Sequence, residues 1–142
     1  MLIMSVDSGE ARTGIAICDK TETLASPVCV ITEYNFEKRV QKVKNKALEL
    51  SAEHIVVGLP KNMDGSEGAR AAACREFADA IFKALDEKIP VSLCDERATT
   101  MLAHTYLSMN DVRGSKRKQS VDAVSAVIIL EDFLAMRKNK GE

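Results

Sequence analysis

The order of strand-like and helix-like segments limits the fold of this chain more than any other feature of its sequence. Three short apolar segments come first, at Leu2–Val6, Thr13–Cys18 and Val28–Thr32, and turn residues separate them. Such closely spaced segments predict three strands in an antiparallel meander. A doubly wound fold with only parallel strands is excluded, because it would not begin with three strands in succession.

After residue 35 the hydrophobic pattern changes to an alternation of helices and strands. Apolar residues spaced by three and four positions, with basic residues between them, predict an amphipathic helix over 36–50. The other expected elements are a buried strand at His54–Leu59, a helix over Cys74–Leu85, a strand at Val91–Cys94, a helix near Thr99–Met109 and a long helix from about Ser120 to Met136. This order predicts an α/β fold with a five-stranded mixed sheet, in which three strands form the antiparallel meander and two run parallel, with helices on both faces.

The composition fits one soluble domain and excludes several classes of protein. The chain has 142 residues, of which 46% are hydrophobic and 29% charged, so it is too apolar to be disordered and needs no disulfide or metal to hold its core. The net charge of −1 excludes a histone-like protein that binds nucleic acid by bulk charge. Aromatic residues make up only 4%, which argues against a protein that binds single strands by stacking successive bases on aromatic side chains.

The cysteines and the apolar segments predict a cytoplasmic location. Cys18, Cys29, Cys74 and Cys94 stand singly in apolar segments without a C-x-x-C pair, so we expect reduced, buried thiols and no zinc site. The first residues lack the basic region of a signal peptide, and no apolar stretch is long enough to span a membrane. The sequence therefore predicts a soluble domain that does not bind membranes.

Three acidic positions stand at the ends of predicted elements. Asp7 ends the first strand and opens the pattern D-x-G-x-x-R-x-G, Asp95-Glu96 ends the fifth strand, and Asp122 lies in the first turn of the last helix. Each alone has a simpler explanation, respectively an Asx turn, a helix N-cap and an acid favoured by the helix dipole. Asp122, however, has apolar neighbours, among which a carboxylate needs a partner or a cation. If the three converge at one edge of the sheet, they form the oxygen-ligand site that Mg²⁺ prefers.

Two further segments have the residues to bind phosphate groups. The stretch from Gly58 to Gly68 leads into a helix, and its exposed backbone N–H groups would make an anion site, although a long flexible connection explains it equally well. It is not a Walker A loop, because it lacks G-K-[ST]. Arg113–Lys118 contains four basic residues and no acid, so we expect a basic loop that either holds a phosphate backbone or is simply solvated.

Four blocks of the sequence resemble one known family, the YqgF/RuvX family. The blocks are the D-x-G-x-x-R-x-G pattern at Asp7–Gly14, GLPKNMDGSEG at Gly58–Gly68, DERATT at Asp95–Thr100 and KRKQSVDAVSAVIIL at Lys116–Leu130, in an order that spans nearly the whole chain. Members of this family are described as Holliday junction resolvases and as nucleases that mature the precursor of small-subunit ribosomal RNA. The resemblance implies an RNase H-like fold, which agrees with the order of elements above.

The resemblance also implies which residues carry the chemistry. The acidic triad of the family falls on Asp7, Glu96 and Asp122, which would be catalytic and would bind Mg²⁺ or Mn²⁺. Asp95 stays open as an alternative to Glu96, because adjacent residues of a strand point to opposite faces. The residues expected to contact nucleic acid are Arg12, Lys61, Gly65, Ser66, Gly68, Arg97, Lys116, Arg117 and Lys118.

In one place the sequence departs from the pattern of RNase H-like nucleases, which commonly carry an acid at the end of the fourth strand. That position reads Gly58-Leu59-Pro60 here, which leaves open whether one or two ions bind. As substrate, the resemblance favours precursor 16S rRNA over four-way DNA junctions. Two other classes stay open, namely a non-enzymatic nucleic-acid-binding module and an ATPase of the actin-like group, although the latter needs two duplicated domains and this chain has length for one.

Overall fold

The computed structural model describes residues 1–9, 11–62, 64–95 and 114–139, with side chains of the last segment described from 123 to 138. The strands are β1 (Ile3–Ser8), β2 (Arg12–Cys18), β3 (Ala25–Thr32), β4 (His54–Leu59) and β5 (Val91–Asp95), and the helices are α1 (Phe36–Glu49), α2 (Ala69–Ala84) and α4 (Gly114–Asn139). These elements follow the predicted order. The helix expected near Thr99–Met109 lies outside the described residues.

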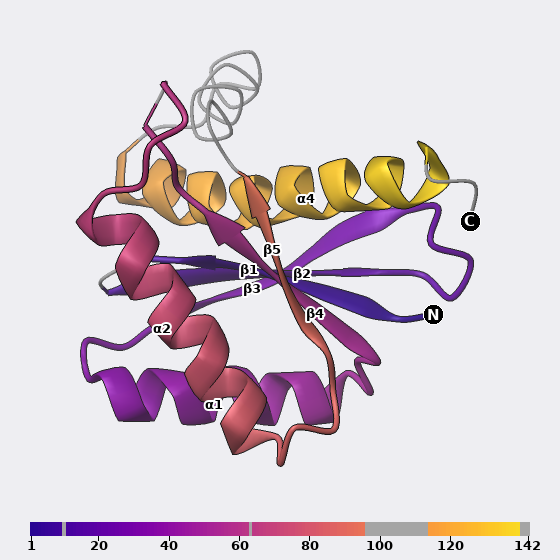
Figure 1. The fold of residues 1–142 in the computed structure, drawn as a ribbon, viewed down its shortest axis with the longest axis horizontal. Helices are drawn as coiled ribbons and strands as arrows, with labels where there is room; N and C mark the ends of the chain where they lie inside the picture. Colours follow the sequence, from indigo (N-terminus) through magenta and orange to yellow (C-terminus); the bar gives the residue numbers. More distant parts are fainter. Residues whose placement is uncertain (10, 63, 96–113, 140–142) are drawn as a thin grey trace.

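The five strands form one mixed sheet in the order β3-β2-β1-β4-β5, so that β1 is central (Figure 1). The pairs β1–β2 and β2–β3 are antiparallel, whereas β1–β4 and β4–β5 are parallel. The predicted sheet of three meander strands and two parallel strands is therefore confirmed. Because β1, β4 and β5 run in one direction, their carboxyl ends meet at one edge, which is where such sheets bind ligands.

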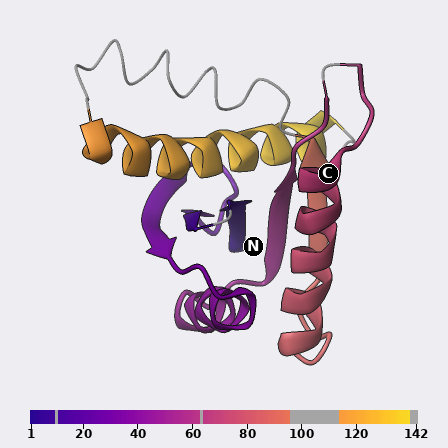
Figure 2. The same ribbon diagram turned by 90° about the vertical axis from the view of Figure 1, so that its left-hand side faces the viewer.

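Helices cover both faces of the sheet, as predicted. Figure 2 shows α4 across one face and α1 and α2 on the other. Side chains along β1 alternate between these faces: Met4 and Val6 pack into the cluster that includes Phe77 and Ile81 of α2, whereas Ile3 packs into the cluster covered by α4. This alternation assigns each later residue of β1 to a face.

The starts of β3 and α2 differ from the predicted ones for local reasons. β3 begins at Ala25 rather than Val28 and runs through Pro27. Proline is tolerated because β3 is an edge strand, and the pairing register shifts by one residue beside it. α2 begins at Ala69, five residues before the predicted start at Cys74. The sequence pattern does not predict this earlier start, because the first turns consist largely of exposed alanines that show no apolar period.

The expected basic loop at Arg113–Lys118 is wrong for residues 114–118, which form the start of α4. Lysine, arginine and glutamine are good helix formers, so this polar stretch extends the apolar helix backwards instead of interrupting it. Arg113 itself lies outside the described residues.

All four cysteines are free thiols. Cys18, Cys74 and Cys94 are buried as predicted, whereas Cys29 on edge strand β3 is only half-buried. Burial raises the pKa of the Cys18 thiol, which favours the unreactive protonated form. Among the helices that the structure describes, none is long and apolar enough to cross a membrane.

An ion pair ties the turn between β2 and β3 to the end of α4. Arg137 Nε lies 2.7 Å from Glu22 Oε1 and its second guanidinium nitrogen, Nη2, lies 3.3 Å from Oε2. The side chains are only 23% and 26% exposed, so solvent screens this pair less than an ordinary surface pair. The hydrogen bonds from Arg137 are the main reason that the pKa of the Glu22 carboxyl is lowered.

We expect Glu22→Gln to lower the free energy of unfolding at pH 7 by about 1 kcal/mol. Because the folded pKa of Glu22 is lowered, its contribution is complete above the unfolded-state value of about 4.3 and is lost as the pH falls through the folded pKa. Thermal melts from pH 7 to pH 3 should therefore show the two proteins converging in acid. Glu49→Gln is the control, since Glu49 is 65% exposed in its pair with Lys46 and should matter little. A pH-independent difference for Glu22→Gln would contradict this account.

Candidate functional site

Asp7 lies at the carboxyl end of the central strand and on the face covered by α4. It is the residue before the last of β1, is half-buried, and pairs with Gly14 of β2. The Ser5 hydroxyl donates a 2.6 Å hydrogen bond to the carbonyl of Ala126 in α4, which places Ser5 on the α4 face. Asp7, two residues further on, shares that face. The sequence thus predicted correctly that Asp7 lies at the end of this strand, where it is the last residue but one.

The backbone of residue 122 lies level with Asp7. Helix α4 runs antiparallel to β1, because Ala126 contacts Ser5 while Arg137 reaches Glu22 at the opposite end of the sheet. From Ala126 back to residue 122 is one helical turn, about 6 Å, and from Ser5 forward to Asp7 is about 6.6 Å. The two acidic positions therefore lie toward the same end of the α4 face, although the Asp122 side chain lies outside the described residues.

Glycines flank Asp7 on both neighbouring strands. Gly14 pairs with Asp7 across β2, and Gly58 follows the Val6–Val57 pair along the parallel strand β4. Neither neighbour places a side chain beside the carboxylate, and both glycines are buried. This is the position at which RNase H-like nucleases commonly carry a further acid, and the structure places Gly58 there.

Asp95 and Asp7 lie on opposite faces of the sheet. In β5, Cys94 packs into the α4-side cluster and Leu93 into the α1/α2-side clusters. Alternation therefore assigns Asp95, the exposed last residue of β5, to the α1/α2 side. This weakens the alternative that Asp95 joins Asp7. Glu96 and Arg97 lie outside the described residues.

The site chemistry that the described residues supply is that of oxygen ligands. Ser125, in the turn after residue 122, has a fully buried hydroxyl with no hydrogen-bond partner among the described residues. The carboxylate oxygens of Asp7, which lies at the strand end, suit Mg²⁺ or Mn²⁺ better than a softer metal. Within the described side chains no group of three acids, histidines or cysteines is close enough to hold a metal, and two of the three predicted ligands fall outside that set.

The loop between β4 and α2 is a small hydrogen-bonded hairpin. Asn62 N–H donates to the carbonyl of Ser66 (2.8 Å), Gly65 N–H to the carbonyl of Asn62 (2.8 Å), and Ser66 N–H to Asp64 Oδ1 (2.9 Å). The expectation of exposed amides is therefore wrong for Gly65 and Ser66, whose N–H groups are used within the loop. Gly65 has a φ of 90°, a conformation that glycine adopts without strain.

The base of the hairpin carries the other predicted residues of this loop. The backbones of Lys61 and Glu67 pair in an antiparallel β-bridge across the hairpin, and Gly68 is the N-cap of α2. Arg75 of α2 donates two hydrogen bonds, of 2.7 and 2.8 Å, to the Glu67 carboxylate, which lower the pKa of the Glu67 carboxyl. This anchor was missed in the sequence, because no local period links residues eight positions apart.

Arg12 and the basic run occupy separate elements. Arg12 is the exposed first residue of β2, and its carbonyl accepts a 2.9 Å hydrogen bond from Gly9 N–H, which closes the turn after Asp7. A Cβ on Gly9 would come within 2.7 Å of that carbonyl oxygen, so the turn requires glycine there. Lys116, Arg117 and Lys118 form part of the start of α4, with side chains outside the described set.

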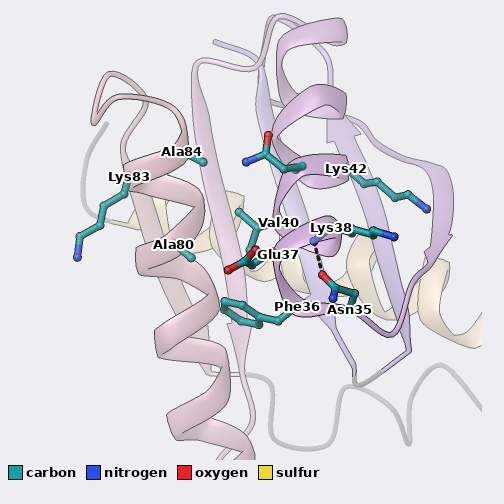
Figure 3. Close-up of a pocket in the computed structure, with 10 residues that line it drawn as sticks. Asn35, Phe36, Glu37, Lys38, Val40, Lys42, Ala80, Lys83 and Ala84 are labelled. Carbon is teal, nitrogen blue, oxygen red and sulfur yellow. Dashed lines mark hydrogen bonds between the residues drawn. The ribbon is translucent and has the colours of Figure 1, made fainter.

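A large pocket of the described structure lies away from this site. It lies between α1 and α2, on the face away from α4, and has a volume of about 920 Å³ (Figure 3). Its apolar wall includes Phe36 and Val40 of α1 and Ala80 and Ala84 of α2, while Lys83 points away from α1. None of the predicted site residues that the structure describes lines it, so its size does not identify it as the reaction site.

Comparison with known proteins gives a consistent result. A family model described as "RuvX: Holliday junction resolvase" matches residues 1–136. A relative from Halothermothrix orenii is 42% identical over 134 residues, covering 94% of each chain, and one from Chloroflexus aggregans is 36% identical over 137 residues, covering 96% of this chain and 95% of the other. Both are named "Putative pre-16S rRNA nuclease".

Solved structures identify the fold. A Thermus thermophilus RuvC structure, in complex with a Holliday junction substrate, superposes with a TM-score of 0.62 at 14% identity and covers 97% of this chain and 96% of the other. The Fowlpox virus resolvase, also with Holliday junction DNA, gives 0.62 at 11% identity and covers 96% and 98%. The five-stranded mixed sheet with its flanking helices is thus the RNase H-like fold that was predicted.

Proposed function

This chain belongs to the RuvX family, and from that membership and the geometry of the strand ends we propose that it is a metal-dependent nuclease that hydrolyses phosphodiester bonds in precursor 16S rRNA. The observation that carries the proposal is the position of Asp7, which faces α4 at the carboxyl end of the central strand, level with residue 122. The names of the relatives support RNA as the substrate. The enzyme would act in the cytoplasm on the 5′ end of the rRNA.

Asp7, Glu96 and Asp122 would hold the metal ion and form the catalytic centre. A divalent ion, Mg²⁺ or Mn²⁺, supplies there the activation of water and the stabilisation of the leaving oxygen. The backbone of Asp7 is held in register by its pairing with Gly14 of β2. Gly14 and Gly58 carry no side chain that would obstruct the scissile phosphate beside Asp7. Asp95 lies on the opposite face of the sheet from Asp7, which supports Glu96 as the third acid.

The residues that position nucleic acid would surround this centre. Arg12 on the turn after Asp7, Lys61 at the base of the hairpin and the N-terminus of α2 after Gly68 all lie near the carboxyl edge of the sheet. Arg97 and the basic start of α4 would add further phosphate contacts. The Gly65 and Ser66 amides are left out of this set, because they donate within the hairpin.

A comparison of substrates tests the proposal against its main alternative. The family description and the two resolvase structures make a Holliday junction nuclease the second candidate. The enzyme should be incubated with Mn²⁺ and either a structured RNA spanning the 5′ end of mature 16S rRNA or a four-way DNA junction. We expect faster cleavage of the RNA. Cleavage of the junction alone would transfer the assignment to a resolvase, and binding without cleavage of either would make the chain a binding module.

Neutralising Lys116, Arg117 and Lys118 together should weaken binding but not chemistry. Loss of up to three phosphate contacts should flatten the slope of log K against log salt by about two to three units, while cleavage at saturating substrate changes little. Neutralising three other lysines, Lys20, Lys83 and Lys88, is the charge-matched control. An equal slope of log K against log salt in both triple variants would show that the basic start of α4 does not contact the nucleic acid.

A further inference from the structure

On the side of the sheet opposite Asp7, the end of β1 opens into a small cavity with basic walls. The cavity has a volume of about 330 Å³ and lies between the end of β1 and the first turns of α1 and α2. Its polar lining consists of Ser8 from β1, Arg39 from α1, and Arg70 and Glu76 from α2. A cavity of this size is at the lower end for ligand pockets and fits a single nucleotide, not a duplex.

Arg39 places a fixed positive charge at this cavity. It is only 9% exposed, and its guanidinium carbon lies 5.7 Å from the ring centre of Phe36 and 5.4 Å from that of Phe77. One guanidinium nitrogen, Nη1, also donates to the carbonyls of Glu33 (3.3 Å) and Tyr34 (3.4 Å). These contacts hold the guanidinium in place, so its charge needs no reordering when an anion arrives.

Arg70 and the start of α2 add the second basic element. Arg70 is the second residue of α2, whose first turn contains no acid and whose N-cap, Gly68, makes no side-chain hydrogen bond. The N–H groups and dipole of such a turn favour an anion. Ser8, which is 8% exposed, also lines the cavity. The lining thus includes a serine as well as charged groups.

The cavity adjoins the candidate catalytic centre along one strand. Ser8, which lines it, follows Asp7 directly, and the two residues point to opposite faces at the same strand end. Gly9, the next residue, also lines the cavity, so the cavity reaches the turn that follows Asp7 and Ser8. The half-buried ring of Phe36 provides an apolar wall beside the basic groups.

We propose that this cavity is a nucleotide subsite, in which Arg70, Arg39 and the start of α2 bind the phosphate of the substrate strand next to the bond that is cleaved. The proposal rests on the nuclease function proposed above, because Asp7 sets the position of the scissile bond. The shared chemistry is a phosphorylated nucleotide, which a free mononucleotide would also present. Glu76 is the one acidic side chain among its described lining residues, and it opposes the phosphate.

Binding of a fluorescent single-stranded oligoribonucleotide, measured by anisotropy in EDTA so that no cleavage occurs, tests the subsite. We expect Arg70→Gln to weaken binding about tenfold, as for loss of one charge-assisted contact, and to reduce the salt slope by about 0.7 to 1. Glu76→Gln should tighten binding severalfold, because it removes a repulsive charge. Lys83→Gln, on the same helix but paired with Asp79 outside the cavity, should leave affinity within twofold.

A second arm with adenosine monophosphate distinguishes the two sources of phosphate. The proposal expects weak binding of the mononucleotide, at millimolar concentration, that Arg70→Gln removes. Tight mononucleotide binding with unchanged oligonucleotide affinity in Arg70→Gln would overturn the strand assignment, and so would equal behaviour of Arg70→Gln and Lys83→Gln. Cleavage by wild type and Asp7→Asn is measured separately. If Arg70→Gln binds the oligonucleotide like wild type while cleavage depends on Asp7, only the subsite is refuted. If Arg70→Gln weakens binding but wild type does not cleave, only the nuclease function is refuted.

Discussion

Glu96→Gln is expected to lose turnover by orders of magnitude while it keeps its affinity for nucleic acid. The substitution removes a carboxylate from the proposed metal site but leaves the proposed phosphate contacts of Arg12, Lys61 and the start of α4, which would provide the binding energy. Single-turnover cleavage with Mn²⁺ gives the rate, and anisotropy in EDTA gives the affinity. A parallel loss of binding would show that Glu96 stabilises the fold or holds substrate instead of metal.

Asp95→Asn is the matched control for that experiment. Asp95 ends β5 on the α1/α2 side of the sheet, away from Asp7, so its amide variant should keep substantial activity. Both changes replace a carboxylate with an amide, at neighbouring positions of the chain. If Asp95→Asn were inactive and Glu96→Gln active, Asp95 would be the ligand and the end of β5 would follow a different register.

Asp7→Asn is expected to be inactive and yet more stable than wild type in EDTA. If Asp7, Glu96 and Asp122 converge, the metal-free protein holds like charges close together, and removal of one relieves their repulsion. We expect a gain of about 1 kcal/mol in the free energy of unfolding, the usual scale for relief of active-site strain. Mg²⁺ or Mn²⁺ should raise the melting temperature of wild type, since only the folded state presents the site, and should do much less for the variant.

Four thermal melts decide this second expectation, one of each protein in EDTA and one in Mn²⁺. Asp19→Asn is a suitable control, because Asp19 lies in the turn after β2 at the opposite end of the sheet and accepts hydrogen bonds from Thr21 and Thr23. Its melting temperature should not rise in EDTA, and it should respond to Mn²⁺ like wild type. An Asp7→Asn protein that is less stable in EDTA and gains from Mn²⁺ as much as wild type would make Asp7 a structural residue.

The sheet could be predicted from the sequence because its signals are local. The three early apolar runs, the continuous run at His54–Leu59 and the short run after Pro90 each specify a strand, and their order leaves one sensible sheet. The place of Asp7 at the end of the central strand follows from the same reasoning. Its face could not be predicted, because that depends on the packing of Ser5 against Ala126, more than a hundred residues away in the chain.

The features that the sequence did not predict depend on tertiary or competing local contacts. The predicted start of α4, about Ser120, is later than the observed start at Gly114, because lysine and arginine are equally compatible with a loop and with a helix. The amides of Gly65 and Ser66 were expected to be free, but Asp64 and Asn62 within the loop accept from them. Arg39 and Arg70 come from different helices and meet at one cavity only in the folded protein. A chain read locally gives no sign of their proximity.

The most direct test of the account is the metal dependence of cleavage by wild type and Asp7→Asn on one end-labelled RNA that spans the 5′ end of mature 16S rRNA. The account predicts cleavage by wild type in Mn²⁺, no cleavage by wild type in EDTA, and no cleavage by Asp7→Asn in either, with both proteins binding the RNA equally. Cleavage that persists in EDTA, or that Asp7→Asn performs at the wild-type rate, would contradict a metal-dependent nuclease centred on Asp7.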